Sequence, residues 1–503
     1  MTHHYIKKIL SSKVYDVAIE TPLESAKNLS QRLSNHILIK REDLQPVFSF
    51  KIRGAYNCIA QLPVDQQARG IVTASAGNHA QGVAMSAEHL KIKATIVMPH
   101  TTPEIKINSV RARGAQVVLY GDSFEEAYTH SQKLIAEQGL VYVHPFDDEN
   151  VIAGQGTIGM EILRQIHGPL DAVFVPVGGG GLIAGIAIYI KYLRPEVKII
   201  GVEPHDACCL KAALDADERV ILPEVGIFAE GVAVAQVGKH NFDIARQYVD
   251  EVITVSTDEL CAAIKDIYDD TRCVSEPSGA CAVAGMKKYV ARDQIEDQTM
   301  VVLSSGANTN FDRLRHVAER AELGEHREAL IAARIPERPG SFKQFCKALG
   351  PRNITEFNYR YSNADQAHVF AGVQIKSGAK ERKQLLNILS GHGITATDLT
   401  DNEMAKIHIR YMVGGHARVS NEAVYRFMFP ERPGALLNFL NKLGQGWNIS
   451  MFHYRNHGSA YGRVLVGMQV LPGDKGELLG YLNELGYTFH EESNNPAYKL
   501  FLN

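Results

Sequence analysis

The chain has 503 residues, which at about 150 residues per domain predicts two to four folded units rather than one core. Hydrophobic residues make up 45% and charged residues 22%, and the 42 glycines and 19 prolines are too few for a fibrous or low-complexity chain. The 53 basic and 56 acidic residues leave a net charge of -3, so no overall positive field exists to bind nucleic acid.

The cysteines, the first residues and one uncharged run indicate the cellular compartment. Seven cysteines, an odd number without a C-x-x-C pair, favour a reducing compartment over a disulfide framework or a thiolate zinc site. The first residues, MTHHYIKKILSSKVYD, lack the apolar run of a signal peptide. The uncharged run Ala172–Ile190 is long enough to span a bilayer, but Pro176 and four glycines interrupt it. We expect a cytoplasmic protein with no membrane partner, no nucleic-acid partner and no metal site.

Residues 1 to about 320 alternate short β-branched runs with longer helical patterns. Apolar runs of this kind, separated by helices, are typical of a mainly parallel sheet covered on both faces, an α/β fold. The predicted strands are 36–40, 70–75, 93–99, 115–121, 172–177, 198–204, 251–256 and 300–306. Because ligands of such sheets bind at the carboxyl ends of the strands, the loops that follow the strands are the candidate sites.

Two of these loops hold residues with a chemical use. In Ser49–Ala55 (SFKIRGA), Lys51 stands just before a helix, whose N-terminus disfavours a cation and suits a Schiff-base lysine. An isolated lysine is far more often a solvated surface residue. Thr73–His79 (TASAGNH) opens a helix and offers N–H groups to an anion, with an amide from Asn78. A plain capped helix start is an equal alternative, and His79 fits a structural role better than that of a base.

The third loop, Val177–Leu182 (VGGGGL), lies between a strand and a helix. Four glycines let the backbone wrap closely around a phosphate, and the helix dipole favours the negative charge. The segment matches neither G-x-G-x-x-G nor G-x-x-x-x-G-K-[ST], which favours a single phosphate over a dinucleotide or ATP.

The rest of the chain contains an internal repeat. A charged linker helix is expected over 321–335, and then PERPGSFKQFCKALG (336–350) recurs as PERPGALLNFLNKLG (430–444). Matches continue in register through Asn353–Ile354 and Asn448–Ile449. Each copy predicts a strand, a Pro-Glu-Arg-Pro-Gly turn, an amphipathic helix and two further strands, the order of a ferredoxin-like unit.

Five segments together resemble the fold-type II pyridoxal-phosphate enzymes, whose catalytic domain is tryptophan synthase β-like and has two lobes. They are SFK-x-RG, SAGNH, GGGGL, EPSGA (276–280) and SSGAN (304–308). With two ACT-like units behind it, the chain resembles the biosynthetic threonine deaminases over essentially its whole length. The resemblance implies a catalytic domain over 1–320, the linker helix, and ACT-like regulatory domains over 330–410 and 423–503.

The resemblance also implies residue roles. Lys51 would hold pyridoxal 5'-phosphate as a Schiff base, with Phe50 near the ring and Asn78 bonded to the ring hydroxyl. The phosphate would lie on Gly178, Gly179, Gly180, Gly181 and Leu182. Ser305, or its neighbour Ser304, would meet the ring nitrogen, and the substrate would lie against Ser75, Ala76, Gly77 and Asn78. Ala76 stands where serine racemases tend to carry a serine, which favours elimination over racemisation.

The implied reaction converts L-threonine to 2-oxobutanoate and ammonia, the first step of isoleucine synthesis, and L-serine to pyruvate. Lys51 would be the base that removes the α-proton. The tail would bind isoleucine as inhibitor and valine as activator at 336–342 with 354–360 and at 430–436 with 449–455, in a homotetramer. The alternatives are another pyridoxal-phosphate-dependent serine/threonine dehydratase or racemase with an amino-acid-sensing tail, a non-enzymatic amino-acid sensor and an NAD-dependent dehydrogenase.

Overall fold

The computed structural model divides into two compact units, Met1–Ala321 and Glu322–Asn503. The structure describes residues 2–336, 341–350, 352, 354–361, 366–376, 378–411, 421–430, 447, 449–455, 461–471 and 473–502.

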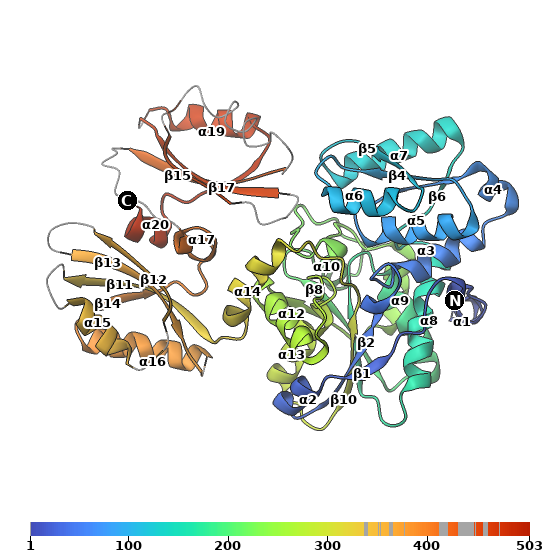
Figure 1. Ribbon diagram of the computed structural model, residues 1–503, viewed down its shortest axis with the longest axis horizontal. Coiled ribbons are helices and arrows are strands. Elements are labelled where there is room, and N and C mark those ends of the chain that lie inside the picture. Colours follow the sequence, from blue (N-terminus) through green and yellow to red (C-terminus); the bar gives the residue numbers. More distant parts are fainter. Residues whose placement is uncertain are drawn as a thin grey trace. The chain divides into compact units, whose positions relative to one another are not determined.

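The first unit contains a six-stranded sheet with the order β1-β2-β10-β7-β8-β9. Strands β1, β2, β8 and β10 of this sheet are labelled in Figure 1. Its strands are β1 (Leu23–Ser25), β2 (His36–Arg41), β10 (Thr299–Ser304), β7 (Ala172–Pro176), β8 (Lys198–Pro204) and β9 (Glu251–Val255). All neighbours are parallel except β1 and β2. The predicted, mainly parallel α/β sheet is therefore confirmed.

Alternate residues of β10, an interior strand of this sheet, enter two different cores. Met300 and Val302 of β10 pack with the side that carries α2, α12 and α13, while Val301 and Leu303 pack with α8, α9, α10 and α11. This alternation is the two-residue period of a strand buried on both faces. The helices are α2 (Lys27–Leu33), α12 (Thr257–Thr271), α13 (Cys281–Asp293), α8 (Glu149–Gln165), α9 (Gly181–Leu193), α10 (Cys209–Ala216) and α11 (Lys239–Tyr248).

A second, smaller sheet forms the other lobe of this unit, with the order β5-β4-β3-β6 and parallel pairing throughout. Its strands are β5 (Gln116–Leu119), β4 (Ala94–Met98), β3 (Ile71–Ala74) and β6 (Val141–Tyr142). The helices of this lobe are α3 (Lys51–Ala60), α4 (Val64–Arg69), α5 (Asn78–Leu90), α6 (Glu104–Arg111) and α7 (Phe124–Gln138), and α1 (Thr2–Leu10) packs on α8 and α9. The two lobes predicted for the catalytic domain thus have one sheet each.

The uncharged run 172–190 folds as strand β7, a glycine loop and the buried helix α9. Among the described residues, no helix is both long enough and apolar enough to cross a bilayer.

The second unit holds two four-stranded antiparallel sheets, with the orders β12-β13-β11-β14 and β16-β17-β15-β18. Both are the ferredoxin-like order, as predicted. Each sheet also shifts register at the matching place, between Ile354 and Glu356 and between Ile449 and Met451, as expected of a duplicated unit. The elements are β11 (Glu328–Pro336), α15 (Ser341–Leu349), β12 (Ile354–Tyr361), β13 (Gln366–Gln374), α16 (Gly378–Gly391), β14 (Thr395–Asp398), α17 (Glu403–Ile407), β15 (Glu422–Pro430), β16 (Ile449–Arg455), β17 (Tyr461–Gln469), α19 (Lys475–Glu484), β18 (Thr488–Glu491) and α20 (Pro496–Phe501).

The linker differs from the helix expected over 321–335. Helix α14 runs over Arg313–Gly324, and strand β11 begins at Glu328. The reason is that 328–335 (EALIAARI) pairs with a strand on each side, β13 and β14, and so gains two ladders of hydrogen bonds that a helix would forgo.

Candidate active site

Lys51 lies at the start of α3, in a segment joined to the loop after β10. Ser49 pairs with Gly306, Phe50 N donates to Ser305 O at 3.2 Å, and Ala307 N donates to Phe48 O at 2.9 Å. These backbone bonds bring the SFK and SSGAN segments side by side, although about half the chain separates them in sequence.

The amine of Lys51 lies in surroundings that favour its neutral form. Its Nζ donates to Pro145 O at 2.8 Å and lies 5.3 Å from the centre of the Phe50 ring. Removal from water lowers the pKa of Lys51 to about 8, against the opposing pull of the Glu276 carboxylate. A lysine with such a pKa has a sizeable neutral fraction near neutral pH, as a nucleophile or base requires.

The glycine loop after β7 is fitted closely to its neighbours. A Cβ on Gly179 would stand 2.2 Å from the Phe146 ring, and one on Gly178 would stand 2.9 Å from Val232 Cα. Gly180 has φ +92°, a conformation that side chains other than glycine rarely adopt. The loop leads into the N-terminus of α9, whose first N–H groups have no acceptor within the helix and suit a phosphate.

The loop Pro145–Phe146 connects these two places. Pro145 accepts the hydrogen bond from Lys51, and Phe146 covers Gly179. The predicted phosphate loop and the predicted Schiff-base lysine therefore line one region.

Asn78, the first residue of α5, contacts a residue from the loop before α13. Asn78 Nδ2 donates to Glu276 Oε1 at 2.6 Å, and Asn308 Nδ2 donates to Asn78 Oδ1 at 2.8 Å. Burial raises the pKa of Glu276, while the bonds from Asn78 and Ser278 act in the opposite direction.

The remaining predicted residues lie in the same loops. Ser305 Oγ makes a long contact of 3.5 Å to Ser278 O, whereas Ser304 Oγ is buried with no hydrogen-bond partner among the described residues. Ser75 Oγ accepts a bond of 3.3 Å from Gly77 N at the turn into α5, where Ala76 also lies. Leu182 is buried at the start of α9.

The sequence motifs contained two of these contacting residues without assigning them a role. Glu276 and Asn308 stand in the EPSGA and SSGAN segments, so their position near Asn78 had a signal in the sequence. The Pro145 carbonyl had none, because a backbone acceptor can belong to any residue type.

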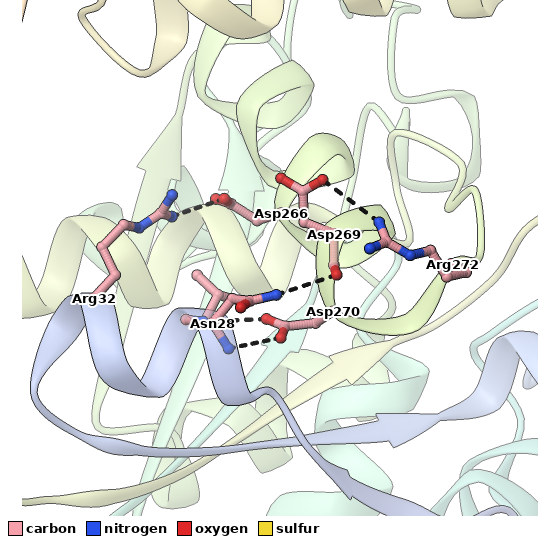
Figure 2. Close-up of a pocket in the computed structure, with 7 residues that line it drawn as sticks. Asn28, Arg32, Asp266, Asp269, Asp270 and Arg272 are labelled. Carbon is pink, nitrogen blue, oxygen red and sulfur yellow. Dashed lines mark hydrogen bonds and ion pairs between the residues drawn. The ribbon is translucent and has the colours of Figure 1, made fainter.

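A surface hollow of about 290 Å³ between α2 and α12 lies apart from this site (Figure 2). Asp270 accepts from the backbone N–H groups of Asn28 and Leu29 at 2.7 and 3.1 Å, and so caps α2 from outside. Arg32 pairs with Asp266 at 2.8 Å. These contacts hold two helices together, and the residues that line the hollow include none of the predicted site residues.

The comparisons with known proteins fit this geometry. Residues 14–306 match the family described as "Pyridoxal-phosphate dependent enzyme". This range contains Lys51, the glycine loop and the first three residues of the SSGAN segment. The fold and the site therefore define a pyridoxal-phosphate-dependent enzyme. Residues 319–409 and 413–502 each match the "C-terminal regulatory domain of Threonine dehydratase".

The relatives are similar over the whole chain. Biosynthetic L-threonine dehydratase of Burkholderia multivorans is 57% identical over 505 residues, covering 100% of this chain and 99% of the relative. That of Escherichia coli is 53% identical over 99% of this chain and 97% of the relative. The processed form of threonine deaminase isoform 2 from Solanum lycopersicum is 51% identical with a TM-score of 0.63, covering 64% of this chain and 93% of that structure.

The chain belongs to the biosynthetic threonine dehydratases, which are pyridoxal-phosphate-dependent lyases. This membership selects the dehydratase over the two alternatives of another class, a non-enzymatic amino-acid sensor and an NAD-dependent dehydrogenase.

Proposed function

We propose that this enzyme converts L-threonine to 2-oxobutanoate and ammonia as the first step of isoleucine synthesis, and L-serine to pyruvate. The observation that carries the proposal is the environment of Lys51. Its pKa is lowered, and its Nζ donates a hydrogen bond to Pro145 O beside the glycine loop and Glu276. The residues fit the cofactor because the loop is a close-packed glycine cradle at a helix N-terminus.

In this proposal each residue has a separate task. Lys51 would hold the cofactor through Nζ, and its amine in the free form would remove the proton from Cα of threonine. When bound, the cofactor supplies an electron sink for the charge left on Cα.

The other residues hold the cofactor and orient the substrate. The N–H groups of the loop 178–182 bind the phosphate, Asn78 donates to the ring oxygen, and Ser305 meets the ring nitrogen. The turn Ser75–Asn78 binds the substrate carboxylate, and Ala76 offers no second proton donor that would return a proton to Cα.

Replacement of the lysine tests the catalytic half. We expect Lys51→Ala to lose turnover by at least about a thousandfold and to lose the absorbance band near the visible edge that a lysine-bound cofactor gives. Lys51→Arg keeps a cation of similar length and should fail equally, because the guanidinium stays protonated. Substantial turnover by Lys51→Ala would show that the lysine is assigned wrongly.

The second half of the proposal concerns control. Isoleucine inhibits and valine activates by binding to the two ferredoxin-like domains, 330–410 and 423–503, of a cytoplasmic homotetramer. The matching folds and the matching register shift of the two sheets support a pair of similar binding sites. Parts of the turns predicted to bind effector, 337–340 and 431–436, lie outside the described residues.

A further inference from the structure

The amide of Asn78 is held in one orientation by a row of hydrogen bonds that begins at a backbone carbonyl. Asn308 Nδ2 donates to both Val47 O and Asn78 Oδ1, each at 2.8 Å. The carbonyl of Val47 can only accept, so the amino group of Asn308 must face it. The same amino group of Asn308 also donates to Asn78, so the side-chain oxygen of Asn78, and not its amino group, must face Asn308.

The other end of the row fixes the same orientation. Asn78 Nδ2 donates to Glu276 Oε1 at 2.6 Å, and Ser278 Oγ donates to the same oxygen at 3.1 Å. Glu276 is buried, 7% exposed, so its acceptor cannot readily be replaced by water. A rotated Asn78 amide would place oxygen against the carboxylate oxygen at one end and amino group against amino group at the other.

The backbone leaves room for this contact only because residue 306 is glycine. A Cβ on Gly306 would stand 2.6 Å from Glu276 Oε1 and 3.2 Å from Asn78 Nδ2. In addition, Gly306 O accepts from Glu276 N at 3.1 Å, which fixes the loop that carries the carboxylate. Three separate loops, after β10, before α13 and at the start of α5, thus converge on one side-chain amide.

We infer that Glu276 is a positioning residue that acts through Asn78. Its carboxylate takes one N–H of the Asn78 amide, and this directs the second N–H toward the ring oxygen of the cofactor. This inference rests on the proposed function, which assigns that ring contact to Asn78. It differs from a direct role for Glu276, such as a counter-charge to Lys51.

A double-mutant cycle separates these two roles, with retention of pyridoxal phosphate by the holoenzyme as the readout. We expect Glu276→Leu to weaken cofactor binding about tenfold, as loss of a buried hydrogen bond worth about 1.4 kcal/mol would do. Asn78→Ala should weaken binding by a similar factor. Adding Glu276→Leu to Asn78→Ala should have little further effect, because the amide that Glu276 positions is gone.

The conservative change Glu276→Gln is the matched control. Both donors reach the same oxygen, Oε1, so the oxygen of glutamine can accept them at the same place. Glu276→Gln should therefore keep cofactor retention within about twofold to threefold of the wild type, with an unchanged absorbance maximum. Circular dichroism of each variant checks that it is folded.

Two outcomes would overturn the inference. If Glu276→Leu weakens binding equally in the wild type and in Asn78→Ala, Glu276 acts directly. If Glu276→Gln is as damaging as Glu276→Leu, the charge matters and not the acceptor. Failure of the proposed function is a different result, since turnover would then survive in Lys51→Ala whatever the cycle gives.

Discussion

Two histidines close to Lys51 are kept neutral by their surroundings. Burial, aided by the charge of Lys51, lowers the pKa of His79 to about 3, and its Nε2 lies 3.1 Å from Val143 O. Burial also lowers the pKa of His144 to about 4, and its Nδ1 accepts from Phe146 N and Asp147 N at 3.2 and 2.8 Å. His144 therefore shapes the loop that contacts both Lys51 and Gly179, and protonation of its Nδ1 would remove that acceptor.

The lowered pKa of His79 has a consequence for stability. Because the folded state binds this proton only below about pH 3, while the unfolded chain binds it near 6.5, the stabilisation is complete above about pH 6.5. It is lost as the pH falls from 6.5 toward 3, by about 1.4 kcal/mol per pH unit. The wild type should unfold at a higher temperature than His79→Gln at pH 7.5, and we expect this difference in thermal midpoint to be smaller at pH 5.5. An equal difference at the two pH values would contradict the lowered pKa of His79.

At this scale the sequence offers candidates for the reacting residues, but it does not give the contacts that the structure shows for them. Lys51, Asn78 and the glycine loop stand in short motifs whose chemistry can be read locally. Their partners come from distant segments, since Asn78 and Glu276 are 198 positions apart and Lys51 and Pro145 are 94 apart. Such pairs are set by the packing of helices and loops, which one sequence does not display.

Three helices set the distance between Lys51 and the glycine loop. Helix α8 lies between α3, which begins with Lys51, and α9, which begins at the glycine loop. Glycines allow both contacts at backbone distance: a Cβ on Gly154 would stand 2.6 Å from Arg53 O, and one on Gly185 would stand 2.4 Å from Ile152 O. The three helices thus form a close-packed spacer for the site.

Buried charges connect α3 and α8 to strand β2 of the large sheet. Arg53 of α3 contacts Glu42 at 2.8 Å and Glu161 of α8 at 2.6 Å, and Lys40 of β2 contacts Glu161 at 2.6 Å. All four side chains are fully buried, and their two positive and two negative charges balance. Because a single partner left alone in such a place is costly, the group is specific for this arrangement of α3, α8 and β2.

The close contact of α8 with α9 predicts a clear effect of Gly185→Ala. The added Cβ would meet backbone atoms, Ile152 O at 2.4 Å and Gly156 N at 2.6 Å, which cannot rotate away. We expect a loss of stability of about 1–3 kcal/mol, measured by urea unfolding, together with weaker cofactor retention because the glycine loop shifts with α9.

The control is the same substitution at Gly480 of α19, which has nothing within 4 Å of its added Cβ. Gly480→Ala should leave stability unchanged or raise it by about 0.5–1 kcal/mol, since alanine is the better helix former. Equal effects at the two glycines would mean that helix propensity, and not packing, governs Gly185.

The predicted elements agree with the structure where they are long and periodic. All eight strands predicted in the first unit are present, because buried parallel strands are continuous apolar runs. Strands β1 and β6, of three and two residues, were missed because such short segments carry no period. The linker was predicted wrongly as helix beyond Gly324, since charged residues and alanine hid the strand that pairing with β13 and β14 stabilises.

At the scale of the whole molecule, the chain consists of a catalytic unit and a unit made of two similar domains. The tomato threonine deaminase structure is matched over 93% of its length by 64% of this chain, so a related protein of about the size of the first unit exists as a structure by itself. The second unit has its own cores, which include Leu330, Phe370, Val424 and Leu465 between its two sheets. Each unit thus has the internal packing that independent folding requires.

This division predicts the effect of ending the chain after Gly324, the last residue of α14. That end point keeps Val317 of α14, which packs in the core of the large sheet. We expect the shortened enzyme to keep turnover of L-threonine within about threefold, because the proposed site residues all precede it, and to lose inhibition by isoleucine.

The sole tryptophan provides a second, independent test of whether isoleucine binds to the second unit. Trp447 lies in the second unit, where it packs against the core formed by β15, β17 and α19. Its ring lies 5.2 Å from the ring of Tyr481. In the full chain, isoleucine should therefore change tryptophan fluorescence over the same concentrations that inhibit turnover, and Trp447→Phe should abolish the signal while inhibition persists.

If the shortened enzyme were still equally sensitive to isoleucine, the inhibitor would bind to the catalytic unit and the regulatory role proposed for the second unit would be wrong. Inhibition that is lost on truncation, with fluorescence and inhibition matched in the full chain, would instead locate the binding of isoleucine in the second unit and require a coupling free energy between two distinct sites.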